Sequence, residues 1–124
     1  MKRDMELVRK ILMAVEEHKN PDKGLRIRID GHEPEEIEYH NGLLHDEGLI
    51  TAMNASSRDG QAFIVTGLTW EGHDFIEAAR NETVWRKAVQ TVMEKGGGFT
   101  LDLMKQLLRK LLSEQVIGKD VGDI

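Results

Sequence analysis

Histidines are the first residues of this sequence that could do chemistry, because imidazole binds metal ions and exchanges protons near neutral pH. His40 and His45 lie five residues apart. That spacing puts their side chains about 140° apart around a helix, whereas two ligands on one helix face need i, i+4 spacing. His73 is followed directly by Asp74, and neighbouring side chains point apart. We therefore expect no metal site, and we interpret His40 as a packed histidine beneath a hairpin.

Carboxylates outnumber cations, with 22 Asp and Glu against 17 Lys and Arg, which gives a net charge of -5. Pairs such as Glu33 and Glu36 could do acid–base chemistry, but exposed clusters of acids are usually solvated and no nucleophile motif accompanies them. Gly96–Gly98 lacks the Lys-Ser/Thr of a phosphate loop and is better explained as a helix stop. We expect neither an enzyme nor a bound cofactor.

Side chains suited to contact a nucleic acid or a protein partner fall into two groups. Arg26 and Arg28 should project together from a strand, and Arg58 should lie at the tip of a hairpin. The second group, Tyr39, Asn41 and His45, should lie on the exposed side of a helix. An arginine can enter a minor groove, and Tyr or Asn can bond to bases or phosphates. Each could equally be an ordinary surface residue.

The predicted recognition helix, which begins at Pro34 or Glu35 and ends at about Glu47, is acidic. Residues 31–50 hold six carboxylates and no Lys or Arg. Because Lys and Arg supply most non-specific affinity for phosphates, this helix opposes DNA. Its charge suits a basic protein partner, which it would attract by electrostatic steering, or it could imitate the charge of DNA.

Periodicity and turn signals predict the elements of residues 1–81. Apolar residues at helical spacing follow the N-cap Asp4 and predict a helix to about His18. Residues 25–30 alternate apolar and charged side chains, as in a half-buried strand. After the acidic helix, which should end at Gly48, residues 50–55 and 61–69 predict a hairpin around Asp59-Gly60.

Three helices should follow the hairpin. Thr69 should cap the first, residues 70–80, with Trp70 and Phe75 available to the core. The remaining sequence predicts a helical hairpin. An amphipathic helix begins at Glu82, Gly96–Gly98 break it, and Thr100 caps a second helix. Its wide apolar surface should either dock on the preceding domain or pair with a second copy of the chain.

The fold class that this order predicts is α+β, a winged helix-turn-helix-like domain with a C-terminal helical hairpin. We expect a winged-helix-like domain over residues 1–81, a two-helix extension over 82–118 and a frayed tail over 119–124. The sequence has no cysteine and no apolar run of the roughly 20 residues that span a bilayer. We expect a cytoplasmic protein with no membrane contact.

The motif Leu-Thr-Trp-Glu-Gly-His-Asp-Phe at residues 68–75, the opening Lys-Arg-Asp-Met at 2–5 and Glu-Ile-Glu-Tyr-His at 36–40 resemble one bacterial and phage family over nearly the whole chain. That family is catalogued as domain of unknown function 2513. The resemblance implies a winged-helix-like fold and a phage or prophage setting, and it implies no specific activity.

Residues 36–50 are also loosely similar to the recognition helix of ArsR-like and MarR-like repressors, which ends in a comparable Glu-x-Gly-Leu sequence. Two departures stand out: those repressors place a short helix where this chain has residues 25–30, and their reading face is not acidic. We therefore expect a non-enzymatic protein that acts through protein contacts and self-associates through its C-terminal helices. The alternative is a DNA-binding regulator, possible but disfavoured by the acidic helix, that uses the wing and strand arginines.

Overall fold

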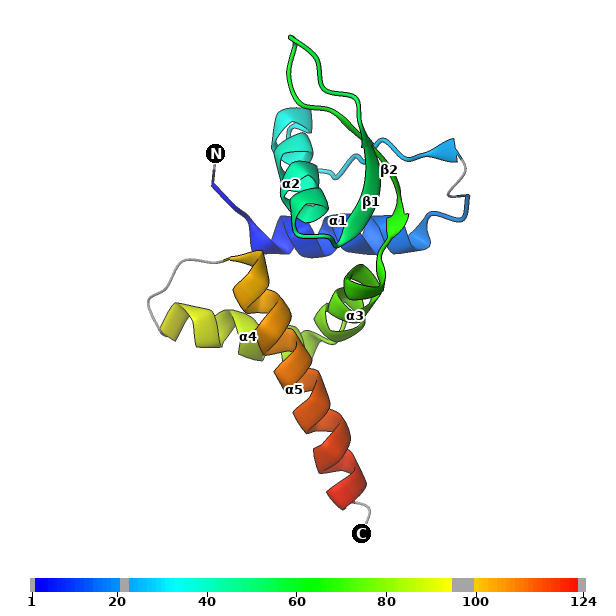
Figure 1. The fold of residues 1–124 in the computed structure, drawn as a ribbon. Coiled ribbons are helices and arrows are strands. Elements are labelled where there is room, and N and C mark those ends of the chain that lie inside the picture. The colour runs from blue at the N-terminus through cyan, green and yellow to red at the C-terminus, as the bar shows by residue number, and fades with distance from the viewer. Residues whose placement is uncertain (1, 21–22, 95–99, 123–124) are drawn as a thin grey trace. The chain divides into compact units, whose positions relative to one another are not determined.

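The computed structural model of the protein describes residues 2–20, 23–94 and 100–122, with side chains up to residue 114. The chain divides into two compact units, residues 1–76 and 77–124, and each is described by itself. The described residues form five helices and one two-stranded antiparallel sheet (Figure 1), which is an α+β fold. The predicted domain boundaries at residues 81/82 and 118/119 stay predictions.

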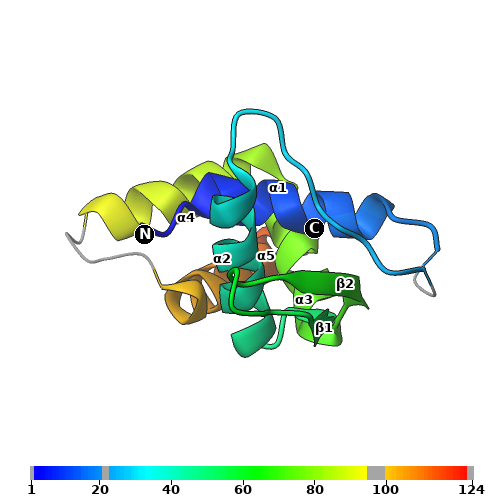
Figure 2. The same ribbon diagram turned by 90° about the horizontal axis from the view of Figure 1, so that it is seen from above.

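The first unit begins with helix α1, Met5–Glu17, which carries much of the core. Asp4 caps it as predicted, since its side chain accepts a hydrogen bond from the backbone N–H of Leu7. One face of α1 is buried throughout, through Met5, Leu7, Val8, Ile11, Leu12 and Val15. This face contacts α2 and β2, which lie above α1 in Figure 1, and Figure 2 shows α2 crossing over α1.

Helix α2, Pro34–Asp46, has the predicted bounds within two residues, with Pro34 in its first turn. The helix ends before Gly48, whose φ of +72° is a conformation that glycine adopts most easily. Leu49 N–H donates to the carbonyl of Leu44 there, at 2.9 Å. This geometry turns the chain directly into strand β1 beside α2.

The hairpin consists of β1, Ile50–Asn54, and β2, Phe63–Leu68. The two strands pair antiparallel, with Asn54 opposite Phe63 and a register shift between Thr51 and Ala52. Phe63 and Val65 point into the core from β2. The turn predicted at Asp59-Gly60 is confirmed to within one residue, since Ser57 and Gly60 form a bridge on either side of Arg58 and Asp59.

The strand predicted for residues 25–30 is wrong except at its first residue. Leu25 exchanges two backbone hydrogen bonds with Val65 of β2, of 2.7 and 3.0 Å, and residues 26–29 form no ladder. The chain leaves the sheet because it turns at Gly31, with φ +85°, to begin α2. The alternation of apolar and charged side chains reflects the burial of Ile27 and does not indicate a strand.

Helix α3, Trp70–Ala79, begins as predicted with Thr69, whose hydroxyl accepts the N–H of Gly72. The predicted core position of Trp70 is wrong, because its exposed fraction is 86%. The buried positions of this helix start at Gly72 and continue through Phe75, Ile76 and Ala79. Trp70 lies two residues before Gly72 and hence on nearly the opposite side of the helix.

In the second unit α4, Glu82–Glu94, contacts α5, Leu101–Gly122. Trp85 of α4 and Met104 of α5 are among the buried side chains, and Thr100 caps α5 by accepting the N–H of Leu103. The break predicted at Gly96–Gly98 lies outside the described residues. The backbone of residues 119–122 continues α5, and residues 123–124 are outside the described residues, so the tail over 119–124 stays a prediction.

Candidate functional site on helix α2

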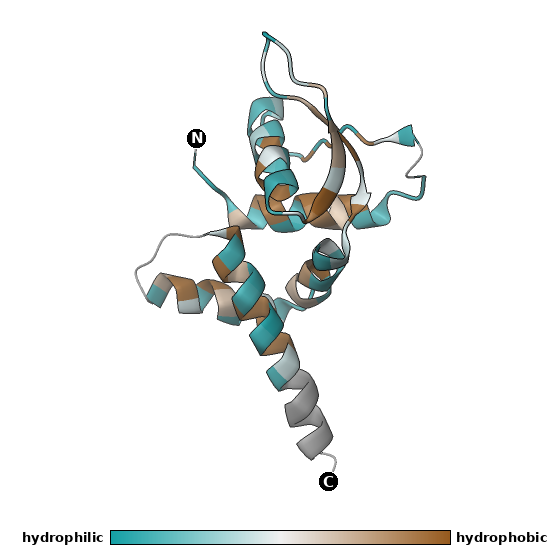
Figure 3. Cartoon of the chain, in the orientation of Figure 1, coloured by the Kyte–Doolittle hydropathy of each residue, from teal (hydrophilic) through white to brown (hydrophobic). Residues whose placement is uncertain are grey.

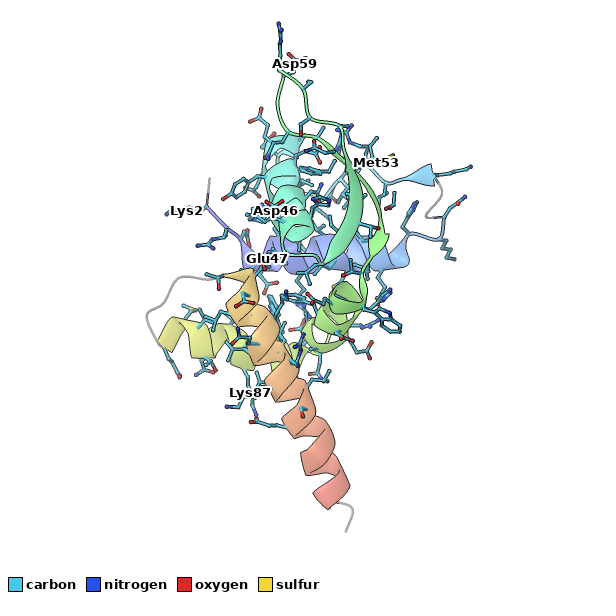
Figure 4. The ribbon with its side chains drawn as sticks, viewed as in Figure 1. Lys2, Asp46, Glu47, Met53, Asp59 and Lys87 are labelled. Atoms are coloured by element: carbon cyan, nitrogen blue, oxygen red, sulfur yellow. The ribbon has the colours of Figure 1, made fainter. Side chains whose placement is uncertain are left out.

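The outward face of α2 is acidic. Glu35, Asp46 and Glu47 are exposed, and Tyr39 and Leu43 are half-buried between them. These five residues are hereafter the outward face. Glu35, Leu43, Asp46 and the C-cap Glu47 lie 4, 4, 7 and 8 residues from Tyr39, so they share its side of the helix. Figure 3 shows the hydrophilic residues along α2, and Figure 4 shows Asp46 and Glu47 at its C-terminal end.

No cation balances this face along the chain. The sequence holds no Lys or Arg between residues 31 and 57, and Arg58 is the sole one between residues 31 and 79. The face therefore presents three exposed carboxylates in a stretch of sequence that holds no Lys or Arg, and His45 Nδ1 lies 3.9 Å from Asp46 Oδ1. Such an arrangement repels phosphates and attracts cationic surfaces.

Glu38 is one of the six carboxylates of residues 31–50, but it is buried. Its side chain is only 6% exposed and its two oxygens have partners on both sides. Oε1 accepts from Asn41 Nδ2 at 2.8 Å, and Oε2 accepts from the backbone N–H of Phe63 at 2.9 Å. Arg26 Nη2 lies 3.6 Å from Oε2 and forms an ion pair with it. Glu38 therefore joins α2 to the start of β2.

Asn41 is likewise wrongly predicted as an exposed contact residue, because it is fully buried. The helical period places position 41 three residues after Glu38, on the side that faces the hairpin. Its Nδ2 donates to Glu38, and its Oδ1 is buried with no hydrogen-bond partner among the described residues. Asn41 therefore serves the packing of α2 and is not available to a partner.

Tyr39 and His45 are accessible to different degrees. Tyr39 is half-buried, and its ring stands edge-on to that of His40 with centroids 5.4 Å apart. The side chain of His45 is 41% exposed, and its ring centroid lies 5.8 Å from that of Phe63. Tyr39 belongs to the outward face, whereas His45 lies toward the hairpin.

The three predicted arginines do not form one cluster of free charges. Arg26 is tied to Glu38, and Arg28 Nη1 donates to the carbonyl of Ile27 at 3.0 Å. Arg58 is exposed in the hairpin turn, next to Asp59, which Figure 4 labels at the tip. The structure therefore brings Arg26 and Asn41 together at Glu38 and leaves Arg58 apart from them.

A second polar cluster lies where α1 and α2 begin, and the sequence analysis missed it. Candidate ligand atoms of Asp4, His32 and Glu36 all lie within 4.8 Å of one another. His32 Nδ1 and Glu36 Oε1 share a hydrogen bond. The i, i+4 spacing of His32 and Glu36 could have suggested their contact, but nothing in the sequence brings Asp4 beside them.

His40 is packed, as predicted, but its contacts are with the helix starts. It is fully buried, its Nε2 accepts the N–H of Asp4 at 2.8 Å, and its Nδ1 donates to the carbonyl of Glu36 at 2.8 Å. These two bonds require the neutral ring with its proton on Nδ1. His40 therefore joins the first residues of α1 and α2.

A comparison with known protein families matches residues 2–98 to the model described as "Hypothetical protein (DUF2513)". The chain belongs to this family. It is also similar to an "Uncharacterized protein" of Haemophilus influenzae, with 33% identity over 117 residues that cover 94% of this chain and 99% of that protein. No solved structure matches the chain. Among the described residues, no helix combines the length and apolarity needed to cross a bilayer.

Proposed function

We propose that this member of the family is a non-enzymatic, winged-helix-like protein that acts through protein contacts. Its outward face binds a basic surface on a partner protein. The observation that carries this proposal is the exposure of Glu35, Asp46 and Glu47 around a half-buried Tyr39, with no Lys or Arg between residues 31 and 57. Aromatic side chains are enriched at protein interfaces, and surrounding charges select the partner.

The order of elements supports a winged-helix-like fold. A helix, a short extended segment, a second helix and a two-stranded hairpin follow one another, as in that fold except for the short helix that precedes its recognition helix. The bridge between Leu25 and Val65 puts β2 between β1 and the extended segment, which is the pairing that a winged helix makes. In that comparison α2 takes the place of the recognition helix, and the hairpin takes the place of the wing.

The differences between this chain and a DNA-binding winged helix favour a protein partner over DNA. A helix-turn-helix has a short helix before the recognition helix, and residues 26–33 form only an irregular segment and a turn. A recognition helix must also approach phosphates, and each exposed carboxylate there opposes the counterion release that drives DNA binding. A basic protein surface meets the same carboxylates favourably, mainly through faster association.

Neutralisation of the outward face tests the proposal. In the variant Glu35→Gln/Asp46→Asn/Glu47→Gln the carboxylates become amides of nearly the same shape. A matched control, Glu17→Gln/Asp30→Asn/Asp59→Asn, changes the net charge equally at exposed positions away from this face. Both variants and the wild type are immobilised, exposed to lysate of the native host and eluted with a salt gradient, and the retained proteins are identified by mass spectrometry.

The proposal predicts a specific basic protein that the wild type and the control retain and the neutralised variant loses. The purified partner should associate more slowly with the neutralised variant than with the wild type. Its dissociation rate should change less than its association rate. Equal retention by all three proteins contradicts the proposed face. Retention of acidic proteins alone contradicts the proposed charge complementarity.

A DNA-binding regulator is the second candidate, and the exposed Arg58 at the hairpin tip favours it. A wing arginine reaches a minor groove without help from the recognition helix. This candidate predicts a gel shift at low salt that weakens steeply as salt rises and is lost in Arg58→Ala. If no complex forms even at low salt, the regulator is eliminated.

Self-association through the C-terminal helices is the last part of the proposal. Leu103, Leu107 and Leu111 lie four residues apart along α5 and are only half-buried, so they form an apolar stripe that a second copy can cover. Light scattering should give a dimer mass for the wild type and a monomer mass for Leu107→Glu. A monomer mass for the wild type at high concentration contradicts this part and leaves the proposed α2 contact untouched.

A further inference from the structure

Asp4, His32 and Glu36 supply the donor set of a metal centre at the meeting point of two helix starts. Asp4 precedes α1, His32 lies in the turn before α2, and Glu36 lies in the first turn of α2. One ligand atom from each can be chosen so that all three lie within 4.8 Å of one another. An imidazole nitrogen and two carboxylate oxygens are ligands that Zn²⁺ and Mn²⁺ share.

The carboxylates of this cluster have one partner that can carry a positive charge, His32, which contacts Glu36. Among the described residues, no Lys or Arg forms an ion pair with Asp4 or Glu36. Asp4 Oδ1 accepts the N–H of Leu7 and Glu36 Oε1 contacts His32, so each carboxylate retains a second oxygen that bonds to none of the described residues. Among the residues that the structure describes, each of the two carboxylates therefore has one oxygen that is available to a metal ion, and neither is paired with a Lys or Arg.

Buried His40 holds the two carboxylate residues at a fixed separation, which is an independent feature of the site. Its Nε2 bonds to the backbone N–H of Asp4 and its Nδ1 bonds to the backbone carbonyl of Glu36, both at 2.8 Å. Because the ring is fully buried, this link does not depend on exposed side chains. Ligands whose backbone is fixed in this way lose little freedom when an ion binds.

We propose that the cluster binds one divalent cation of the Zn²⁺ type through His32 and the carboxylates of Asp4 and Glu36. The ion takes the place of the proton that His32 Nδ1 and Glu36 Oε1 share, and water completes the coordination shell. The proton is released to solvent, as ligation of an imidazole requires. Bound in this way, the ion connects the starts of α1 and α2 and raises the thermal stability of the first unit.

Three substitutions remove ligands with little damage to the fold. Asp4→Asn keeps a good N-cap, since Asn and Asp cap helices equally well, but removes the charge. His32→Gln and Glu36→Gln remove the other two ligands and keep a polar side chain of similar length. The matched controls are Glu35→Gln, one residue from Glu36 but exposed, and His73→Gln, an exposed histidine of α3.

The experiment is calorimetric titration of Zn²⁺ into metal-free protein without an affinity tag, repeated with Ca²⁺ because a site with imidazole disfavours that ion. We expect one Zn²⁺ per chain, a higher melting temperature with Zn²⁺, and affinity about tenfold or more lower in each ligand variant. The two controls should bind as the wild type does. Absence of saturable binding overturns the site, as does affinity that His32→Gln and Asp4→Asn leave unchanged.

Discussion

Glu38 offers the sharpest test of how α2 is held against the hairpin. Its carboxylate is 6% exposed and accepts from two donors, the side chain of Asn41 and the backbone N–H of Phe63. The substitution Glu38→Ala leaves both donors without an acceptor in a buried setting. It also removes the ion pair with Arg26.

Each buried donor that loses its acceptor costs about 1–3 kcal/mol. The ion pair adds at most about 1 kcal/mol, because the Arg26 side chain is 51% exposed and its charge is screened by solvent. Alanine also removes the cost of burying the carboxylate, which offsets part of this loss. We expect Glu38→Ala to lower the free energy of unfolding by about 3 kcal/mol.

Glu38→Gln should be much milder, because Asn41 can rotate its amide. The buried Oδ1 of Asn41 has no partner among the described residues, so a rotated amide can accept from the new Gln side chain. The Gln oxygen then still accepts from Phe63, so both hydrogen bonds are kept. The charge is lost, and Asn41 Nδ2 replaces Oδ1 as the buried atom without a partner. We expect about 1 kcal/mol for this variant.

Thermal unfolding measures both variants. For a chain of 124 residues each kcal/mol corresponds to about 4 °C, so the melting temperature should fall by about 12 °C for Ala and about 4 °C for Gln. Hydrogen exchange at the Phe63 amide gives the local readout, with protection lost in Glu38→Ala and kept in Glu38→Gln. Equal melting temperatures for the two variants, or a Phe63 amide equally protected in both, would show that Glu38 does not hold α2 against the hairpin in this way.

Three further substitutions test other parts of the fold by chemical denaturation. His40→Ala should lower the free energy of unfolding by about 2–4 kcal/mol, because a buried ring and its hydrogen bonds to the starts of α1 and α2 are lost. A change below about 1 kcal/mol would contradict that role. Gly72→Ala should lower the free energy of unfolding by about 3 kcal/mol although alanine has the better helix propensity, because a Cβ there would lie 2.0 Å from the carbonyl oxygen of Leu49. The control is Asp74→Ala on the exposed side of the same helix. Trp70→Ala should change stability by less than about 0.5 kcal/mol, and a larger loss would show that the ring is packed.

Local signals predicted the elements of this fold well where capping and periodicity agree. Asp4, Thr69 and Thr100 each cap a helix through the expected side-chain oxygen. Gly48 and the Asp59-Gly60 turn also fall where the sequence places them. These features depend on residues within four positions of one another, which is the range over which a sequence directly specifies structure.

The site was predicted less well because its contacts join distant segments. The sequence does not indicate the burial of Glu38, because carboxylates are rarely buried unless paired and its partners Phe63 and Arg26 lie 25 and 12 positions away. The alternation at residues 25–30 satisfied the strand rule, yet a strand needs a neighbour along its whole length and β2 pairs with Leu25 alone. The cluster of Asp4 with His32 and Glu36 likewise depends on how α1 packs against α2.

The most direct test of the proposed function compares partner binding by the two charge-neutralised proteins at the same ionic strength. We expect the Glu35/Asp46/Glu47 amide variant to associate with the host partner several-fold more slowly than the control variant, which should match the wild type. Identical association rates for the two variants would contradict the claim that the acidic side of α2 recognises the partner.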